Sequence, residues 1–250
     1  RLLSIAEAPI TIAEPAHPVA LPASPAIALS QVGFSYDGGA PVLVDLDLAV
    51  APGEHIAIVG ASGIGKSSLL NLLLRLAEPQ QGEITLGGVP LAQLALADLH
   101  ASMTLLSQDS PLFNDTIRAN LLLARPDADE PAMWTALRDA GIEGFVIALP
   151  QGLDTLLGEG GRTVSAGQAR RLCLARALLS PAPILLLDEP TTGLDRSAEL
   201  AFFATLRSAA VGRSAILVTH AAIPEGTVDR VLSLRNGRLQ ADRHPMPHPH

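Results

Sequence analysis

The chain has 250 residues, of which 48% are hydrophobic and 17% charged, and its formal net charge is −8. This length and composition fit one large globular domain or two small ones and exclude a disordered chain. The negative net charge argues against a general nucleic-acid binder, so no nucleic-acid partner is expected. The single cysteine, Cys173, excludes an internal disulfide.

The first 26 residues are rich in alanine and proline, which predicts an extended linker. Prolines interrupt the stretch 15–36, which lacks Asp, Glu, Lys and Arg, so this stretch is not expected to span a membrane as a helix. Because the chain begins with Arg1 rather than Met, we expect it to be a piece of a longer protein with a membrane domain before the linker. An ordered domain is expected over residues 27–240, followed by a flexible tail over 241–250.

The first elements predicted along the chain are β-strands. Apolar and polar residues alternate over 27–36, and residues 42–50 hold one or two more strands. The run 55–59 shows little alternation, which is typical of a strand buried on both faces of a parallel sheet. Glycines follow it, and then an apolar helix through 69–74.

The second half of the chain contains two further hidden strands, at 184–187 and 215–218, with helical segments between strands. This alternation predicts a parallel sheet covered on both sides. The middle, about 91–179, is predicted to be mostly helical. Near the end, Asn236-Gly237 within 230–239 predicts a two-residue hairpin.

A phosphate-binding loop is predicted at Gly60–Ser68, which reads GASGIGKSS and matches G-x-x-x-x-G-K-[ST]. Glycines let backbone N–H groups approach phosphates, and the following helix presents its positive end to the anion. A glycine-rich turn without a ligand is the alternative, but a hidden strand before the motif and a helix after it favour phosphate binding. The candidate ATP contacts in the motif are Gly60, Ser62, Gly63, Gly65, Lys66, Ser67 and Ser68.

Two carboxylates follow the hidden strand at 184–187. Asp188 is expected to hold the Mg²⁺ shell and Glu189 to polarise the attacking water. Adjacent strand residues point to opposite faces, so this division of roles needs a bend after Asp188, which Pro190 makes plausible. A solvated acidic turn is the alternative.

The run Val164-Ser-Ala-Gly-Gln168 precedes a predicted helix and resembles the signature of ABC transporter ATPase domains, usually Leu-Ser-Gly-Gly-Gln. The chain already has one phosphate loop, so a second anion-binding helix start makes sense if it serves the ATP of a partner domain. The resemblance implies a head-to-tail dimer around two ATPs. The residues expected to meet the partner's ATP are Ser165, Ala166, Gly167 and Gln168. Ala166 replaces a glycine, and a positive φ there would weaken this contact.

The remaining motifs of that family appear in order. Tyr36 resembles the aromatic residue that stacks on adenine, and Gln108 the residue that contacts Mg²⁺ and links the site to the membrane domain. Asp195 matches the carboxylate of the loop that crosses the dimer seam, and His220 the histidine that contacts the γ-phosphate. The resemblance therefore implies a catalytic group of Lys66, Glu189 and His220, and Mg²⁺ ligands Ser67, Gln108 and Asp188.

The resemblance covers about 27–239 and implies an α/β fold. Its parts would be a P-loop NTPase core with a mostly parallel sheet, an N-terminal antiparallel β subdomain, and an inserted helical subdomain at about 109–180. The stretches 112–120 and 149–161 resemble exporter-type domains, which touch a membrane domain at the cytoplasmic face of the inner or plasma membrane. The isolated fragment is expected to be soluble.

Finer details at 158–162, 168–171 and 219–221 resemble bacterial exporters of cysteine and glutathione needed for cytochrome bd assembly, which are heterodimers. Lipid, peptide and drug exporters share the other features. The alternative is a soluble ABC ATPase that acts on nucleic acid or the ribosome. Such proteins usually carry long coiled-coil insertions or a second tandem domain, and 250 residues hold neither.

Overall fold

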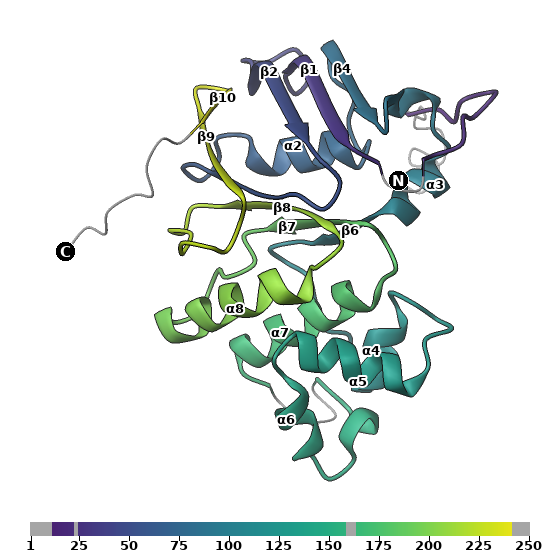
Figure 1. Cartoon of the computed structure of the whole chain (residues 1–250), viewed down its shortest axis with the longest axis vertical. Helices are drawn as coiled ribbons and strands as arrows, with labels where there is room; N and C mark the ends of the chain where they lie inside the picture. The colour runs from purple at the N-terminus through teal and green to yellow at the C-terminus, as the bar shows by residue number, and fades with distance from the viewer. Residues whose placement is uncertain (1–11, 23–24, 159–163, 242–250) are drawn as a thin grey trace, which may run out of the picture.

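The computed structural model describes residues 12–22, 25–158 and 164–241 and contains two β-sheets (Figure 1). The four-stranded sheet has the order β2-β1-β4-β5 and is antiparallel throughout. Its strands are β1 (Ile27–Phe34), β2 (Leu43–Val50), β4 (Gln81–Leu86) and β5 (Val89–Pro90). This sheet corresponds to the antiparallel β subdomain expected from the sequence.

The six-stranded sheet has the order β10-β9-β3-β8-β7-β6, and only β10 is antiparallel to its neighbour. Its strands are β3 (His55–Val59), β6 (Met103–Leu106), β7 (Ile184–Asp188), β8 (Ser214–Thr219), β9 (Arg230–Arg235) and β10 (Arg238–Ala241). The mostly parallel sheet predicted for a P-loop NTPase core is therefore confirmed. The β9–β10 turn has positive φ at Asn236 (49°) and Gly237 (74°), as the predicted hairpin requires.

Helices cover both faces of the six-stranded sheet. They are α2 (Lys66–Leu73), α3 (Leu96–Ser102), α4 (Ile117–Leu122), α5 (Glu130–Asp139), α6 (Glu143–Ile147), α7 (Ala166–Leu179) and α8 (Arg196–Ala209), with short 3-10 turns at Leu91–Gln93 and Gly152–Asp154. Helix α2 and the antiparallel sheet lie on one side, whereas α4 to α8 lie on the other (Figure 1).

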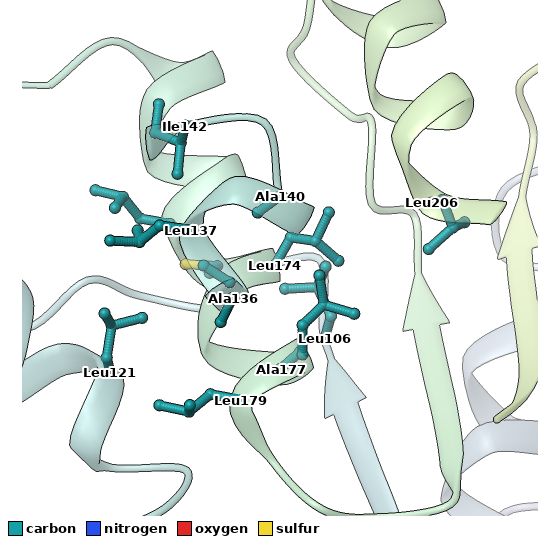
Figure 2. Packing of buried hydrophobic residues seen from close by; sticks show 14 of the residues in the cluster. Leu106, Leu121, Ala136, Leu137, Ala140, Ile142, Leu174, Ala177, Leu179 and Leu206 are labelled. Atoms are coloured by element: carbon teal, nitrogen blue, oxygen red, sulfur yellow. The ribbon is translucent and has the colours of Figure 1, made fainter. Parts of the chain in front are cut away.

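The alternating side chains of β7 explain why two separate cores form. Ile184 and Leu186 pack in the core shared with α2 and the antiparallel sheet. Leu185 and Leu187 pack in the core shared with α4 to α8. Because successive strand residues point to opposite faces, a continuous apolar strand must be covered on both sides. In the second core, α7 packs against α5, and Ala136 of α5 lies in the same cluster as Leu174 and Ala177 of α7 (Figure 2).

Strand β6 was not predicted, because the middle of the chain was expected to be mostly helical. It is only four residues long and follows α3 directly, so its sequence offers no period of its own. Pairing with β7, from Met103 with Ile184 to Leu106 with Leu187, defines it as a strand. Tertiary pairing therefore decides the structure of this segment.

The described part of the expected linker, 12–22, contacts the domain. The backbone N–H of Val19 donates to Gln93 O at 2.8 Å, and Leu96 N donates to the Glu14 carboxylate at 3.2 Å. Residues 1–11, and the expected tail after Ala241, lie outside the described residues. No helix in the described part of the chain combines the length and the apolar character needed to cross a bilayer.

Candidate active site

The phosphate loop follows β3 and leads into α2, as its sequence predicted. Gly63 and Gly65 have φ values of 76° and 108°, which L side chains rarely adopt. A Cβ on Gly65 would lie 2.7 Å from Val42 Cγ1, and one on Gly60 would lie 2.9 Å from Leu234 O. Space therefore excludes a side chain at Gly60 and Gly65, and backbone strain disfavours one at Gly63. Helix α2 begins with no side-chain cap, so its first N–H groups suit an anion.

Lys66 lies inside this loop rather than in solvent. Its side chain is 5% exposed, and Nζ donates to Gly60 O at 2.9 Å and Ala61 O at 3.0 Å. The same ammonium lies 3.2 Å from Glu189 Oε1. Lys66 thus connects the phosphate loop with the acidic end of β7.

The bend predicted after Asp188 is present at Glu189, which adopts a left-handed φ of 46°. This conformation costs a non-glycine residue about 1–3 kcal/mol unless its surroundings hold it. Here Glu189 N donates to Val218 O at 2.9 Å, and Glu189 O accepts from Thr192 N at 3.2 Å. These contacts fix the Glu189 side chain beside Lys66.

His220 completes the surroundings of Glu189. Its Nδ1 lies 2.8 Å from Glu189 Oε2, which also accepts from the His220 backbone N–H and from the Thr219 hydroxyl. Burial raises the pKa of Glu189, but hydrogen bonds from His220 and Lys66 outweigh it, so the pKa lies below its ordinary 4.5. Glu189 is therefore ionised at neutral pH and able to accept a proton.

Asp188 and Ser67 offer oxygen ligands beside each other, and the exposed Gln108 follows β6, the strand next to β7. Asp188 Oδ1 is buried and has no hydrogen-bond partner among the described residues. Burial raises the pKa of Asp188, and a hydrogen bond with Ser67 opposes this effect. Mg²⁺ in NTPases is held by one or two carboxylates together with substrate phosphates, and an unpartnered buried carboxylate oxygen fits that role. The described residues contain no cluster of three or more His, Cys, Asp or Glu that could hold a metal alone.

Tyr36, the expected adenine-stacking residue, lies beside the phosphate loop. Its hydroxyl is 2.9 Å from Ser68 Oγ, and its ring meets the edge of Phe34 with centroids 4.7 Å apart. The side chain is 51% exposed. These contacts fix the ring while leaving about half of its surface available. Ser62 and Gln108 are also exposed.

The signature residues start helix α7. Ser165 and Gln168 form a capping box, with Gln168 N donating to Ser165 Oγ at 3.2 Å and Ser165 N to Gln168 Oε1 at 2.9 Å. Ala166 is the first helical residue and does not have the positive φ that would have strained it. Ser165 and Ala166 are exposed, and a Cβ on Gly167 would find only Leu194 and Ser165 within 4 Å. This face of the helix start is open.

Asp195 has a local role in this chain. Its carboxylate caps α8 by accepting from Ala198 N at 2.8 Å. The side chain is otherwise exposed, so the expected contact across a dimer seam is sterically open.

Sequence reasoning missed Arg170, a buried residue of α7. Its guanidinium donates to Ser107 O and Gln108 O at 2.9 Å each and to Glu189 O at 3.0 Å. In the sequence, Arg170 is one of three arginines in a helix that otherwise reads as mostly apolar. Nothing in that pattern separates Arg170 from its neighbour Arg171.

The family model described as ABC transporter matches residues 43–192 of this chain. The chain belongs to the ABC transporter family. A solved bacterial Atm1-family ABC exporter with ATP bound is similar to this ABC domain with a TM-score of 0.86 and 36% identity, over 95% of the chain and 42% of that structure. The fold expected from the sequence is thereby confirmed, and as a member of this family the chain is an ATPase.

Two curated relatives indicate which part of a transporter the chain resembles. The ATP-dependent lipid A-core flippase of Chromobacterium violaceum is 40% identical over 234 residues, which cover 91% of this ABC domain and 40% of the relative. The multidrug efflux ATP-binding/permease protein of Mycobacterium bovis is 38% identical, over 96% of the domain and 20% of the relative. The domain thus spans less than half the length of these relatives. They support the exporter-type assignment, but they give no support to cysteine or glutathione as cargo.

Proposed function

We propose that this chain is the nucleotide-binding domain of an exporter and that it closes on a second ATPase domain of the same type around two Mg-ATP. The observation that carries the proposal is the position of the Glu189 carboxylate, 3.2 Å from Lys66 Nζ and 2.8 Å from His220 Nδ1, at the edge of the sheet where the phosphate loop begins. Open α/β sheets bind ligands at the carboxyl ends of their strands. A base, a phosphate-binding cation and an orienting imidazole therefore share one edge.

ATP binding on this side involves the phosphate loop and Tyr36. The glycines of the loop admit the phosphates, and the adenine stacks on the exposed surface of Tyr36. Lys66 exchanges the carbonyls of Gly60 and Ala61 for the β- and γ-phosphate oxygens, a charge-assisted contact. Ser67, Gln108 and Asp188 would hold Mg²⁺, which neutralises phosphate charge when bound.

Hydrolysis needs a water in line with the γ-phosphorus. Glu189 accepts a proton from this water as the new oxygen–phosphorus bond forms and the bond to the β–γ bridging oxygen breaks. His220 holds the Glu189 carboxylate and contacts the γ-phosphate, so base and phosphate stay in register. The products are ADP and inorganic phosphate.

The second domain completes the site from the other side. Ser165, Ala166, Gly167 and Gln168 start a 14-residue helix and present an open, uncharged surface. We propose that this helix start meets the partner's γ-phosphate and that Asp195 lies near the seam. The two ATPase domains would lie at the cytoplasmic face of the inner or plasma membrane, and a membrane domain would use their closure and opening for export. The relatives named as a flippase and an efflux protein support an export role over the alternative of an ATPase that acts on nucleic acid or the ribosome.

A complementation experiment tests this proposal. Lys66→Ala disables the chain's own phosphate loop, whereas Ser165→Glu places a charge in the helix start that faces the partner. Each variant alone has two damaged sites in its dimer, but a mixed dimer contains one site with an intact phosphate loop and an intact signature. We expect phosphate release to reappear on mixing. A mixture without activity, from folded variants of which Ser165→Glu still binds ATP, would contradict pairing between copies of this chain.

A further inference from the structure

One face of α7 holds the loop that carries Gln108. Three side chains spaced three residues apart along the helix donate to backbone carbonyls of residues 107–111. The donors and their acceptors are Arg170 with Ser107 and Gln108 at 2.9 Å each, Cys173 with Ser110 at 3.4 Å, and Arg176 with Pro111 at 3.0 Å. Because the order of the acceptors follows the order of the donors, the loop runs along the helix in a fixed register.

Arg170 is the member of this row that also reaches the base. Its Nη2 donates to Glu189 O at 3.0 Å, so it supports the carbonyl of the residue with the left-handed backbone. The residue is 8% exposed. Burial lowers the pKa of Arg170, and the nearby Asp109 and Asp188 oppose that effect. A planar guanidinium can donate to three carbonyls in one fixed arrangement, which a lysine ammonium on a flexible stem cannot reproduce.

Helix α7 therefore touches two different nucleotide sites. Its start, at Ser165, faces the partner's nucleotide in the proposed dimer, whereas Gln108 and Glu189 serve the nucleotide bound by this chain. The helix is 14 residues long and packs against α5 over its buried side, so Ser165 at its start and Arg170 within it belong to one continuous packed element. Rigid elements and hydrogen bonds of this kind carry coupling between sites.

We propose that Arg170 is a positioning residue that couples the two nucleotide sites of the dimer. A shift of α7 caused by nucleotide at Ser165 passes through the Arg170 guanidinium to the backbone of Gln108 and Glu189. Arg170 touches no reacting atom and acts only through these two residues. This inference rests on the proposed function, because it needs a partner's nucleotide at the signature.

Arg171 provides a matched control on the same helix. Its guanidinium also donates to two carbonyls, those of Ala140 and Gly141, at 3.4 Å and 3.1 Å. Those acceptors end α5, which lies across the six-stranded sheet from α2 (Figure 1). Arg171→Met therefore removes the same charge and a similar number of hydrogen bonds without touching the Gln108 loop.

The experiment compares Arg170→Met, Arg170→Lys and Arg171→Met by amide hydrogen exchange, ATP titration and ATP turnover. In Arg170→Met we expect faster exchange over residues 107–111 and 189–192, ATP affinity within roughly twofold of the unchanged chain, and kcat lowered at least about tenfold, as expected for loss of a buried charged donor. Arg170→Lys should bind ATP equally well and still lose most turnover. Arg171→Met should show neither the faster exchange nor the lower kcat.

Several results would overturn the proposal. One is an unchanged rate of amide hydrogen exchange over 107–111 in Arg170→Met. Another is a loss of kcat in Arg171→Met as large as that in Arg170→Met. The third is full turnover in Arg170→Lys. If Arg170→Met does not fold, Arg170→Lys is compared with Arg171→Met by the same measurements of hydrogen exchange and kcat. Failure of the unchanged chain to bind ATP would instead contradict the proposed function, and it would be seen before any variant is made.

Discussion

His220 Nδ1 lies 2.8 Å from Glu189 Oε2, although the two residues follow different strands, β8 and β7. These strands are parallel neighbours, so their carboxyl ends meet at one edge of the sheet. Strand β8 also pairs with β3, which leads into the phosphate loop. The order β3-β8-β7 thus brings the phosphate loop, the imidazole and the base to the same edge of the sheet.

Replacing the base separates binding from chemistry. In Glu189→Gln we expect ATP binding to persist and turnover to fall at least about 100-fold, because a general base contributes roughly 10²–10⁴ in rate. Glu83→Gln, on an exposed position of β4, removes the same charge without a contact to the site and should keep full turnover. Phosphate release at saturating Mg-ATP measures both variants. Normal turnover in Glu189→Gln would remove Glu189 from its proposed role.

The pH dependence of turnover should report the contacts of Glu189. Hydrogen bonds from His220 and Lys66 hold the pKa of Glu189 below 4.5, so the base stays ionised as pH falls to that range. In His220→Ala one of these contacts is lost, the pKa rises, and the acid limb of the kcat profile should move to higher pH. Profiles of both proteins between pH 4 and 8 measure the shift. An unmoved acid limb would show that His220 does not control the ionisation of Glu189.

Ionised Asp188 should lower the stability of the nucleotide-free chain. Its pKa is raised by burial above the ordinary 3.8, so the folded state binds its proton more tightly than the unfolded state. The ionised carboxylate therefore destabilises the fold, fully at pH values above the folded pKa and not at all below the unfolded one. Asp188→Asn should raise the thermal midpoint at pH 7, and this advantage should disappear as pH falls below about 3.8. A lower midpoint at pH 7 would contradict burial as the dominant effect.

Asp195 offers a test that separates its cap from its charge. Asp195→Ala removes the hydrogen bond to Ala198 N and should lower the free energy of unfolding by about 1 kcal/mol. Asparagine caps helices as well as aspartate does, so Asp195→Asn should preserve stability. Denaturant unfolding measures both variants. If they lost stability equally, the charge rather than the cap would be the stabilising feature.

The sequence predicted those parts of the site that depend on local spacing. Gly63 and Gly65 were identified from the loop motif, and the left-handed φ of Glu189 supplies the bend that two adjacent carboxylates required. Likewise, the alternation of Leu185 and Leu186 between two cores follows from one unbroken apolar strand. In each case the neighbouring residues in the sequence are enough to predict the local conformation.

Other features depend on contacts that are distant in sequence. Arg170 donates to Gln108, 62 positions away, and no local pattern distinguishes it from Arg171. Strand β6 exists because Met103 to Leu106 pair with β7, about 80 positions on. The contact of Val19 with Gln93 is another such case, since a segment rich in proline and alanine reads as a linker in isolation.

The most direct test of an ATP-dependent dimer is light scattering of Glu189→Gln with and without Mg-ATP, together with a nucleotide titration of the same sample. The variant retains Lys66 and the phosphate loop but cannot complete hydrolysis, so bound ATP should hold two domains together. We expect saturable ATP binding and a shift from monomer to dimer that depends on nucleotide. A folded sample that fails to bind ATP would contradict this expectation.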